Sequence, residues 1–152
     1  MISNALRILK QTRTNIHQLV SGYSLEQITR IPEGFNNNLI WNYGHVLVTQ
    51  QLLCYKLSGN TPAIPDSIID RYRKGTFPNH PNAGADLELF HQMCFEQVNQ
   101  LEDDINQGLF ANYNRYQTSF GLELTSIEDA ILFNNSHEAM HFGAMLMIKK
   151  FI

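Results

Sequence analysis

Ser-His-Glu-Ala-Met-His-Phe-Gly, residues 136–143, decides the fold and the candidate chemistry of this chain. His137 and His141 are four residues apart, and residues at this spacing lie one above the other on a helix, with Cβ atoms roughly 5–6 Å apart. Both imidazoles can then reach one ion at about 2.0–2.1 Å, whereas a strand would hold the rings too far apart. The stretch therefore predicts a helix that presents a metal-binding pair.

The same letters match H-E-x-x-H, the zinc-protease motif in which the glutamate is a general base. The extended motif needs glycine and a third histidine where this chain has Ala144 and Met147. Only residues 142–152 follow the pair, and none of them is His, Asp, Glu or Cys. A third ligand must come from upstream, which argues against a protease. Glu138 is rotated by about 100° from His137, so it either bends toward the ion or points at a neighbouring helix or subunit.

Size and composition suggest one domain, residues 1–152, with a single core. Apolar residues make up 43% of the chain and charged residues only 16%, against about 25% charged in typical domains. A domain so poor in charge is expected to bury extra surface against a second copy or around a cofactor. The net charge is −3, and the sequence lacks the clustered lysine and arginine residues of a nucleic-acid interface.

The sequence shows no targeting or membrane signal. Residues 1–4 lack the basic segment of a signal peptide, and the uncharged run 34–55 is interrupted by Asn, Gln and Gly. Cys54 and Cys94 show no pairing pattern, so we expect reduced thiols in a cytoplasmic protein. Both are interpreted as small buried hydrophobic residues, with a functional thiol as the alternative.

Helical periodicity predicts an all-α four-helix bundle with long connections. A capping box at 24–27 opens a short helical turn. A proline-rich connection spans 62–81 and holds a short helix near 67–74. Strand signals are weak throughout. The four long helices are expected at about 3–21, 38–58, 86–105 and, after a capping box at 125–128, from there nearly to the C-terminus.

The upstream ligand is expected at His45 on the second helix. His45 shares an inward helix face with Trp41, Val48 and Leu52. Gly44 lowers helix propensity by about 1 kcal/mol relative to Ala, so its presence indicates a close approach by a neighbouring helix or a ligand. A core histidine bonded to a carbonyl is the alternative for His45.

Three imidazoles on one divalent ion leave open positions for water or substrate, as in catalytic sites. Imidazole accepts Zn²⁺, Ni²⁺ and Fe²⁺, so the sequence leaves the metal open. Asn38 and Asn134 each share a face with a ligand, although helix capping or surface roles are alternatives. The other histidines, His17, His80 and His91, are expected at surface, loop and rim positions. The predicted metal ligands are His45, His137 and His141, and the predicted pocket lining is Asn38, Trp41 and Asn134.

Residues 37–45, Asn-Asn-Leu-Ile-Trp-Asn-Tyr-Gly-His, and residues 136–143 together resemble the DinB/YfiT-like metalloenzyme superfamily. Ile31-Pro32-Glu33-Gly34 adds to the resemblance. It implies a four-helix bundle, commonly dimeric, with a divalent metal on His45, His137 and His141. Some relatives are transferases that join bacillithiol, mycothiol or glutathione to electrophiles, and one branch is a thiol-dependent maleylpyruvate isomerase. Relatives often carry a basic residue where this chain has Phe142.

The resemblance predicts a divalent-metal-dependent enzyme, a thiol-dependent S-transferase acting on a small molecule as a homodimer. A metal would lower the pKa of a bound low-molecular-weight thiol. Arg71, Arg73 and Lys74 are the cations of the long connection that could meet a carboxylate-rich thiol. A noncatalytic metal- or ligand-binding dimer and a metal-assisted hydrolase are the alternatives. No nucleic-acid or membrane partner is expected.

Overall fold

The computed structural model describes residues 2–152, and its architecture is all-α, as predicted. The four long helices are α1 (Ile2–Ser21), α3 (Leu39–Cys54), α5 (Ala83–Asn106) and α6 (Ile127–Ile148). Shorter elements lie in the connections: α2 (Leu25–Thr29), the 3₁₀ turn η1 (Lys56–Ser58), α4 (Asp66–Tyr72), and the strands β1 (Tyr116–Gln117) and β2 (Glu123–Leu124).

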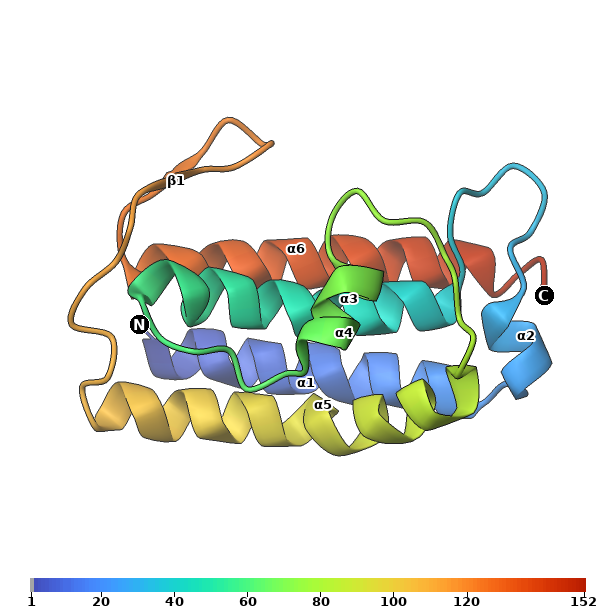
Figure 1. Cartoon of the computed structure of the whole chain (residues 1–152), viewed down its shortest axis with the longest axis horizontal. Helices are drawn as coiled ribbons and strands as arrows, with labels where there is room; N and C mark the ends of the chain where they lie inside the picture. The colour runs from blue at the N-terminus through green and yellow to red at the C-terminus, as the bar shows by residue number, and fades with distance from the viewer. Residues whose placement is uncertain (1) are drawn as a thin grey trace.

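The long helices form a bundle in which α6 packs against α3 and α1, and α5 packs against the same two helices (Figure 1). Helices α1 and α6 run in one direction and α3 and α5 in the other (Figure 1). Because α3 and α5 are parallel, the chain must travel back along the bundle between them. Residues 55–82 make this crossover and include α4, which explains the long proline-rich connection in the sequence. No helix among residues 2–152 has the length and hydropathy to cross a membrane.

Two features near helix ends and connections differ from the predictions. The capping box at Ser24 forms as expected, but the one predicted at 125–128 is wrong by one residue. Ser126 is the N-cap of α6 and accepts from the Asp129 amide, while the Asp129 carboxylate accepts from the amide and hydroxyl of Thr125. The hairpin of β1 and β2 was missed because strands of two residues are too short to show alternation.

Helix α3 is buried on nearly every side, because α4 and α2 cover the face that α5 and α6 leave open. Gly44 makes this contact with α4 possible. A Cβ at Gly44 would lie 2.5 Å from Cδ1 of Tyr72 and 2.7 Å from Cζ of Phe90. The predicted close approach at Gly44 is therefore confirmed, and it comes from aromatic rings of α4 and α5.

The bundle core has two apolar clusters, one toward each end. On α1, Leu9 belongs to one cluster and Ile16 to the other, and Arg13 lies between them, fully buried. On α6, the fully buried Glu138 lies between residues of the two clusters in the same way. A polar layer around Arg13 and Glu138 thus separates two apolar ends of one bundle.

Candidate metal centre

The three predicted ligands meet in the bundle. His45 comes from the middle of α3, and His137 and His141 come from the facing side of α6. One possible ligand atom of each residue lies within 4.8 Å of those of the other two. The ring centroids are 4.5–5.2 Å apart. The cluster can therefore bind a metal ion.

Neighbouring oxygens orient two of the three rings. His45 Nδ1 lies 2.7 Å from the Tyr72 carbonyl oxygen, to which it donates. His141 Nδ1 lies 2.8 Å from Oδ1 of Asn42, whose amide nitrogen donates to the Asn38 carbonyl at 2.7 Å. With Nδ1 protonated, Nε2 carries the lone pair in both rings, and on His45 that lone pair meets only the Thr49 hydroxyl, at 3.4 Å. Histidine ligands typically donate their second nitrogen to an oxygen in this way.

His137 differs from the other two, because its Nδ1 is buried and has no hydrogen-bond partner among the described residues. A buried nitrogen without a partner loses roughly 1–3 kcal/mol of solvation that nothing returns. A metal ion would give the His137 ring a partner. The neutral ring of His137 and the unprotonated Nε2 atoms of His45 and His141 make a donor set that fits a divalent ion.

Burial also keeps these imidazoles neutral, the form that binds metals. Desolvation, followed by repulsion from His141 and His45, lowers the pKa of His137 to about 2. Desolvation and His45 lower the pKa of His141 to about 3, and desolvation lowers the pKa of His45. Protons therefore compete weakly with a metal at neutral pH.

Glu138 points away from the cluster. Its carboxylate accepts from Nε of Arg13 at 2.6 Å and from a terminal guanidinium nitrogen at 2.7 Å, and also from the Asn134 amide at 2.8 Å. Both members of the ion pair are 0% exposed. The sequence left open whether Glu138 bends toward the ion or points at a neighbouring helix or subunit. In the structure it contacts Arg13 of the neighbouring helix α1. Glu138 is not free to act as a base beside an ion, so the protease interpretation lacks its catalytic group.

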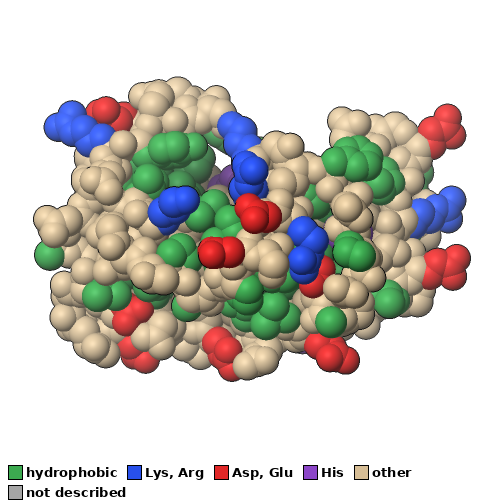
Figure 2. Space-filling model, viewed as in Figure 1, with side chains coloured by type: hydrophobic (Ala, Val, Ile, Leu, Met, Phe, Trp, Pro, Cys, Tyr) green, Lys and Arg blue, Asp and Glu red, His purple; other side chains and the backbone are tan. Residues whose placement is uncertain are grey.

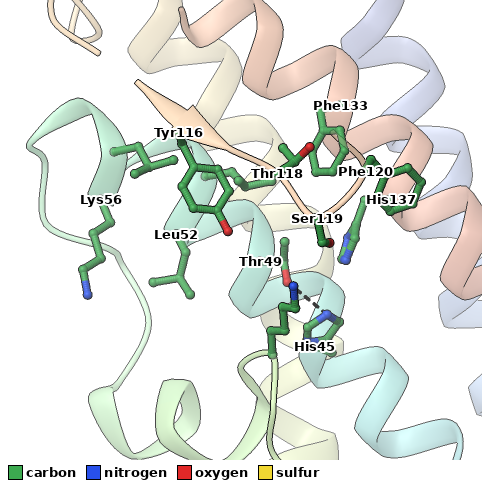
Figure 3. Close-up of a pocket in the computed structure, with 13 residues that line it drawn as sticks. His45, Thr49, Leu52, Lys56, Tyr116, Thr118, Ser119, Phe120, Phe133 and His137 are labelled. Carbon is green, nitrogen blue, oxygen red and sulfur yellow. Dashed lines mark hydrogen bonds between the residues drawn. The ribbon is translucent and has the colours of Figure 1, made fainter. Parts of the chain in front are cut away.

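A cavity of about 270 Å³ opens beside His45 and His137, beneath the hairpin. Figure 2 shows this side of the molecule, with apolar side chains in the hollow, a histidine deep inside it and cations near its edge. In Figure 3, Ser119 and Phe120 reach from the hairpin toward His137, and Thr49 lies above His45. The Thr49 hydroxyl is 3.4 Å from Nε2 of His45. The other lining residues are Leu52, Leu53, Lys56, Leu57, Lys74, Tyr116, Thr118 and Phe133.

The residues that we expected to line a pocket lie elsewhere. Asn38 is the N-cap of α3, where it accepts from the Trp41 amide. Trp41 stacks on the His45 ring, with centroids 4.6 Å apart and planes at 9°. Asn134 is buried and donates to Glu138. None of Asn38, Trp41 and Asn134 is among the residues that line the cavity, because they hold the helices and rings around it.

Of the three cations expected near a substrate, Lys74 lines the cavity. Arg71 is paired with Asp86 at 2.6 Å, and Arg73 lies 3.8 Å from Asp70. Sequence reasoning missed Lys56, which no motif marks and which reaches the cavity from η1. It also missed the hairpin contribution, since nothing in residues 116–124 indicates that the segment folds back over α3.

The family model of the DinB superfamily matches residues 8–145, from α1 to near the end of α6. The chain belongs to the DinB superfamily. This confirms the family that the motifs predicted. The matched region of this DinB-superfamily protein contains all three clustered histidines, and the superfamily is metal-binding. No curated protein matches the chain.

Proposed function

We propose that this DinB-superfamily protein is a divalent-metal-dependent S-transferase that joins a small anionic thiol to an apolar electrophile. The observation that carries the proposal is the position of the three-histidine cluster at an apolar cavity whose lining includes Lys56 and Lys74. A purely structural metal site would need neither the cavity nor cations at its edge.

A divalent ion on these three imidazoles would supply a Lewis acid that lowers the pKa of a thiol. The protein contributes three neutral imidazoles. Hydrogen bonds to Tyr72 and Asn42 hold two of these rings in one tautomer and orientation. The donor set is compatible with Zn²⁺, Ni²⁺ and Fe²⁺.

The lysines supply the anion recognition in this proposal. Lys56 and Lys74 are exposed, and neither forms an ion pair within residues 2–152. Their ammonium groups are free to meet carboxylates of a thiol. Lys74 is close enough that its charge contributes to the lowered pKa of His45. The hydroxyls of Thr49 and Ser119 are available to orient the thiol.

Apolar side chains form the place for the electrophile. Phe120 packs edge-on against Phe133, with ring centroids 5.6 Å apart, and Leu52 lines the cavity from α3. These side chains would exclude water from the reacting groups, which favours transfer to a thiol over hydrolysis.

The test compares metal-free protein with protein reloaded with Zn²⁺, Ni²⁺ or Fe²⁺, using thiols of different charge and a panel of electrophiles. Mass spectrometry should detect conjugates only with metal and mainly with anionic thiols. Lys74→Gln should raise KM for the anionic thiol several-fold and leave kcat nearly unchanged, whereas Lys150→Gln on the exposed C-terminal end should change neither. Metal that raises Tm without any conjugation across the panel would support the noncatalytic alternative.

We also propose a homodimer formed through the outer face of α6. Leu132, Met140 and Met147 are 46–49% exposed there, next to small residues such as Gly143 and Ala144. A large apolar helix face on a domain with few charges typically marks an interface, and a two-fold pair would use the same face on both copies. Light scattering should give twice the chain mass of 17.5 kDa; a particle of one chain's mass at micromolar concentration would contradict the dimer.

A further inference from the structure

A second group of histidines lies on the other pair of helices. His17 of α1 and His91 of α5 are both half-buried, and their Nδ1 atoms are 2.9 Å apart. Their rings meet edge to face, with centroids 4.5 Å apart and planes at 78°. Sequence reasoning expected separate surface and rim positions, because residues 74 apart on different helices show no pattern.

Aromatic and hydroxyl groups, rather than ion-pair partners, contact this histidine pair in the part of the chain that the structure describes. Neither histidine forms an ion pair within residues 2–152. Phe95 packs edge-on against the His17 ring at 5.2 Å. The Tyr43 hydroxyl is 3.3 Å from Nδ1 of His17 and donates to the Phe90 carbonyl. Burial raises the pKa of Tyr43, so its oxygen remains a neutral hydroxyl.

We propose that His17 and His91 form a second metal site, which takes Cu²⁺ or Ni²⁺ through the two Nδ1 atoms. Ligand nitrogens at about 2.05 Å from an ion are about 2.9 Å apart in adjacent square-planar positions, but about 3.3 Å apart in a tetrahedron. The hydrogen-bonded separation of 2.9 Å equals the one that the square arrangement needs, so an ion could replace the shared proton without moving the two nitrogens apart. Cu²⁺ and Ni²⁺ prefer that geometry and accept imidazole, whereas protein-bound Zn²⁺ is usually tetrahedral.

Metal binding to this pair needs no other reactant, because the shared proton can move to another nitrogen of the same ring. In the metal-free pair, the two Nδ1 atoms share one proton in a hydrogen bond. When an ion takes the place of that proton, the ring that carried it adopts the other tautomer, with the proton on Nε2. Neutral rings therefore bind without net proton release. Water completes the coordination, and two protein ligands make this site weaker than the three-histidine cluster.

The site is independent of the first one. It joins α1 to α5, whereas the cluster joins α3 to α6, and the two share no residue. An ion on His17 and His91 would add a further link between helices that already share the Lys10–Glu102 ion pair. We therefore expect Cu²⁺ or Ni²⁺ at this site to raise Tm even when the cluster is disabled.

The experiment is calorimetric titration of metal-free, tag-free full-length protein with Cu²⁺ and with Ni²⁺. The wild type should bind two ions per chain in a tight and a weaker class. His91→Gln and His17→Gln should each remove the weaker class, and His141→Ala should greatly weaken the tight class and leave the weaker one. His80→Gln, which changes a histidine outside both groups, should keep two ions.

Circular dichroism checks that each variant folds. Zn²⁺ should fill the weaker class at least 10-fold less tightly than Cu²⁺. A single class of ions in the wild type, or two classes that persist in both His91→Gln and His17→Gln, would overturn the second site and leave a hydrogen-bonded pair. Neither outcome bears on the three-histidine cluster, which His141→Ala reports separately.

Discussion

Two buried polar regions meet along α6, and they differ in the partners of Glu138 and of the three histidines. Glu138 and Arg13 form a layer in which the carboxylate has three donors. The guanidinium also reaches the carbonyl oxygens of Cys94 and Val46 at 3.4–3.5 Å. The histidine cluster, one residue away in sequence, keeps free lone pairs and the orphaned Nδ1 of His137, and it faces a cavity.

This difference separates the role of the glutamate in the His-Glu-x-x-His motif from the role of its two histidines. A buried polar group whose partners all come from the protein holds elements together, because its bonds are complete without a ligand. A buried imidazole that lacks a partner, lies beside other imidazoles and lines a cavity marks the place where a ligand fits. By this criterion, Glu138 is structural, and the histidines form the site.

The largest effect is expected from breaking the polar layer. Arg13→Ala leaves the Glu138 charge buried without its partner, which should lower the free energy of unfolding by about 3–5 kcal/mol. Lys10→Ala is the control on the same helix, because Lys10 pairs with Glu102 in a half-exposed bridge worth about 0.2–1 kcal/mol. Urea unfolding measures both. Equal losses in the two variants would contradict a structural role for the layer.

The next effect concerns the cluster. His141→Ala should weaken divalent-metal binding more than about 100-fold, since loss of a group that merely supports a ligand already costs 10–100-fold. It should also abolish turnover while circular dichroism stays nearly unchanged, because Ala favours the helix. Met140→Ala, at an exposed neighbouring position, should leave affinity intact. Full activity in metal-free His141→Ala protein would end the metalloenzyme hypothesis.

A smaller effect is expected from Gly44→Ala, which tests how α4 orients the cluster. The new Cβ would meet the Tyr72 ring, so overpacking should lower the free energy of unfolding by about 1–3 kcal/mol. Displacement of Tyr72 would also remove the carbonyl that orients His45, so metal affinity should fall. Gly143→Ala is the matched control, because open space surrounds that position. Thermal melts and metal titrations should distinguish the two variants. Unchanged metal affinity in Gly44→Ala would contradict the role of α4 in orienting His45.

The smallest effect is expected on the rate of Glu138→Gln. This variant should be less stable, because a neutral amide cannot balance Arg13. Its kcat per folded molecule should stay within about threefold of the wild type, whereas loss of a general base would lower the rate by about 10²–10⁴-fold. Steady-state rates at a temperature where circular dichroism shows full folding decide between these outcomes.

The sequence by itself determined the helical class, the family and the three clustered histidines. Helical periodicity and i,i+4 spacing are local, so the pair at His137 and His141 can be read from residues 136–143. The inward face of His45 and the unusual Gly44 likewise follow from one turn of helix. These properties can be predicted without knowing which helices pack together.

Only the tertiary structure decided which groups meet. The partner of Glu138, Arg13, is 125 residues away, the cavity needs a hairpin that returns over α3, and His17 meets His91 across two helices. Such contacts depend on how elements cross in space, and one sequence carries no local periodicity for them. The physical reason is that backbone geometry sets spacing along a helix, whereas packing of the whole bundle sets distances between helices.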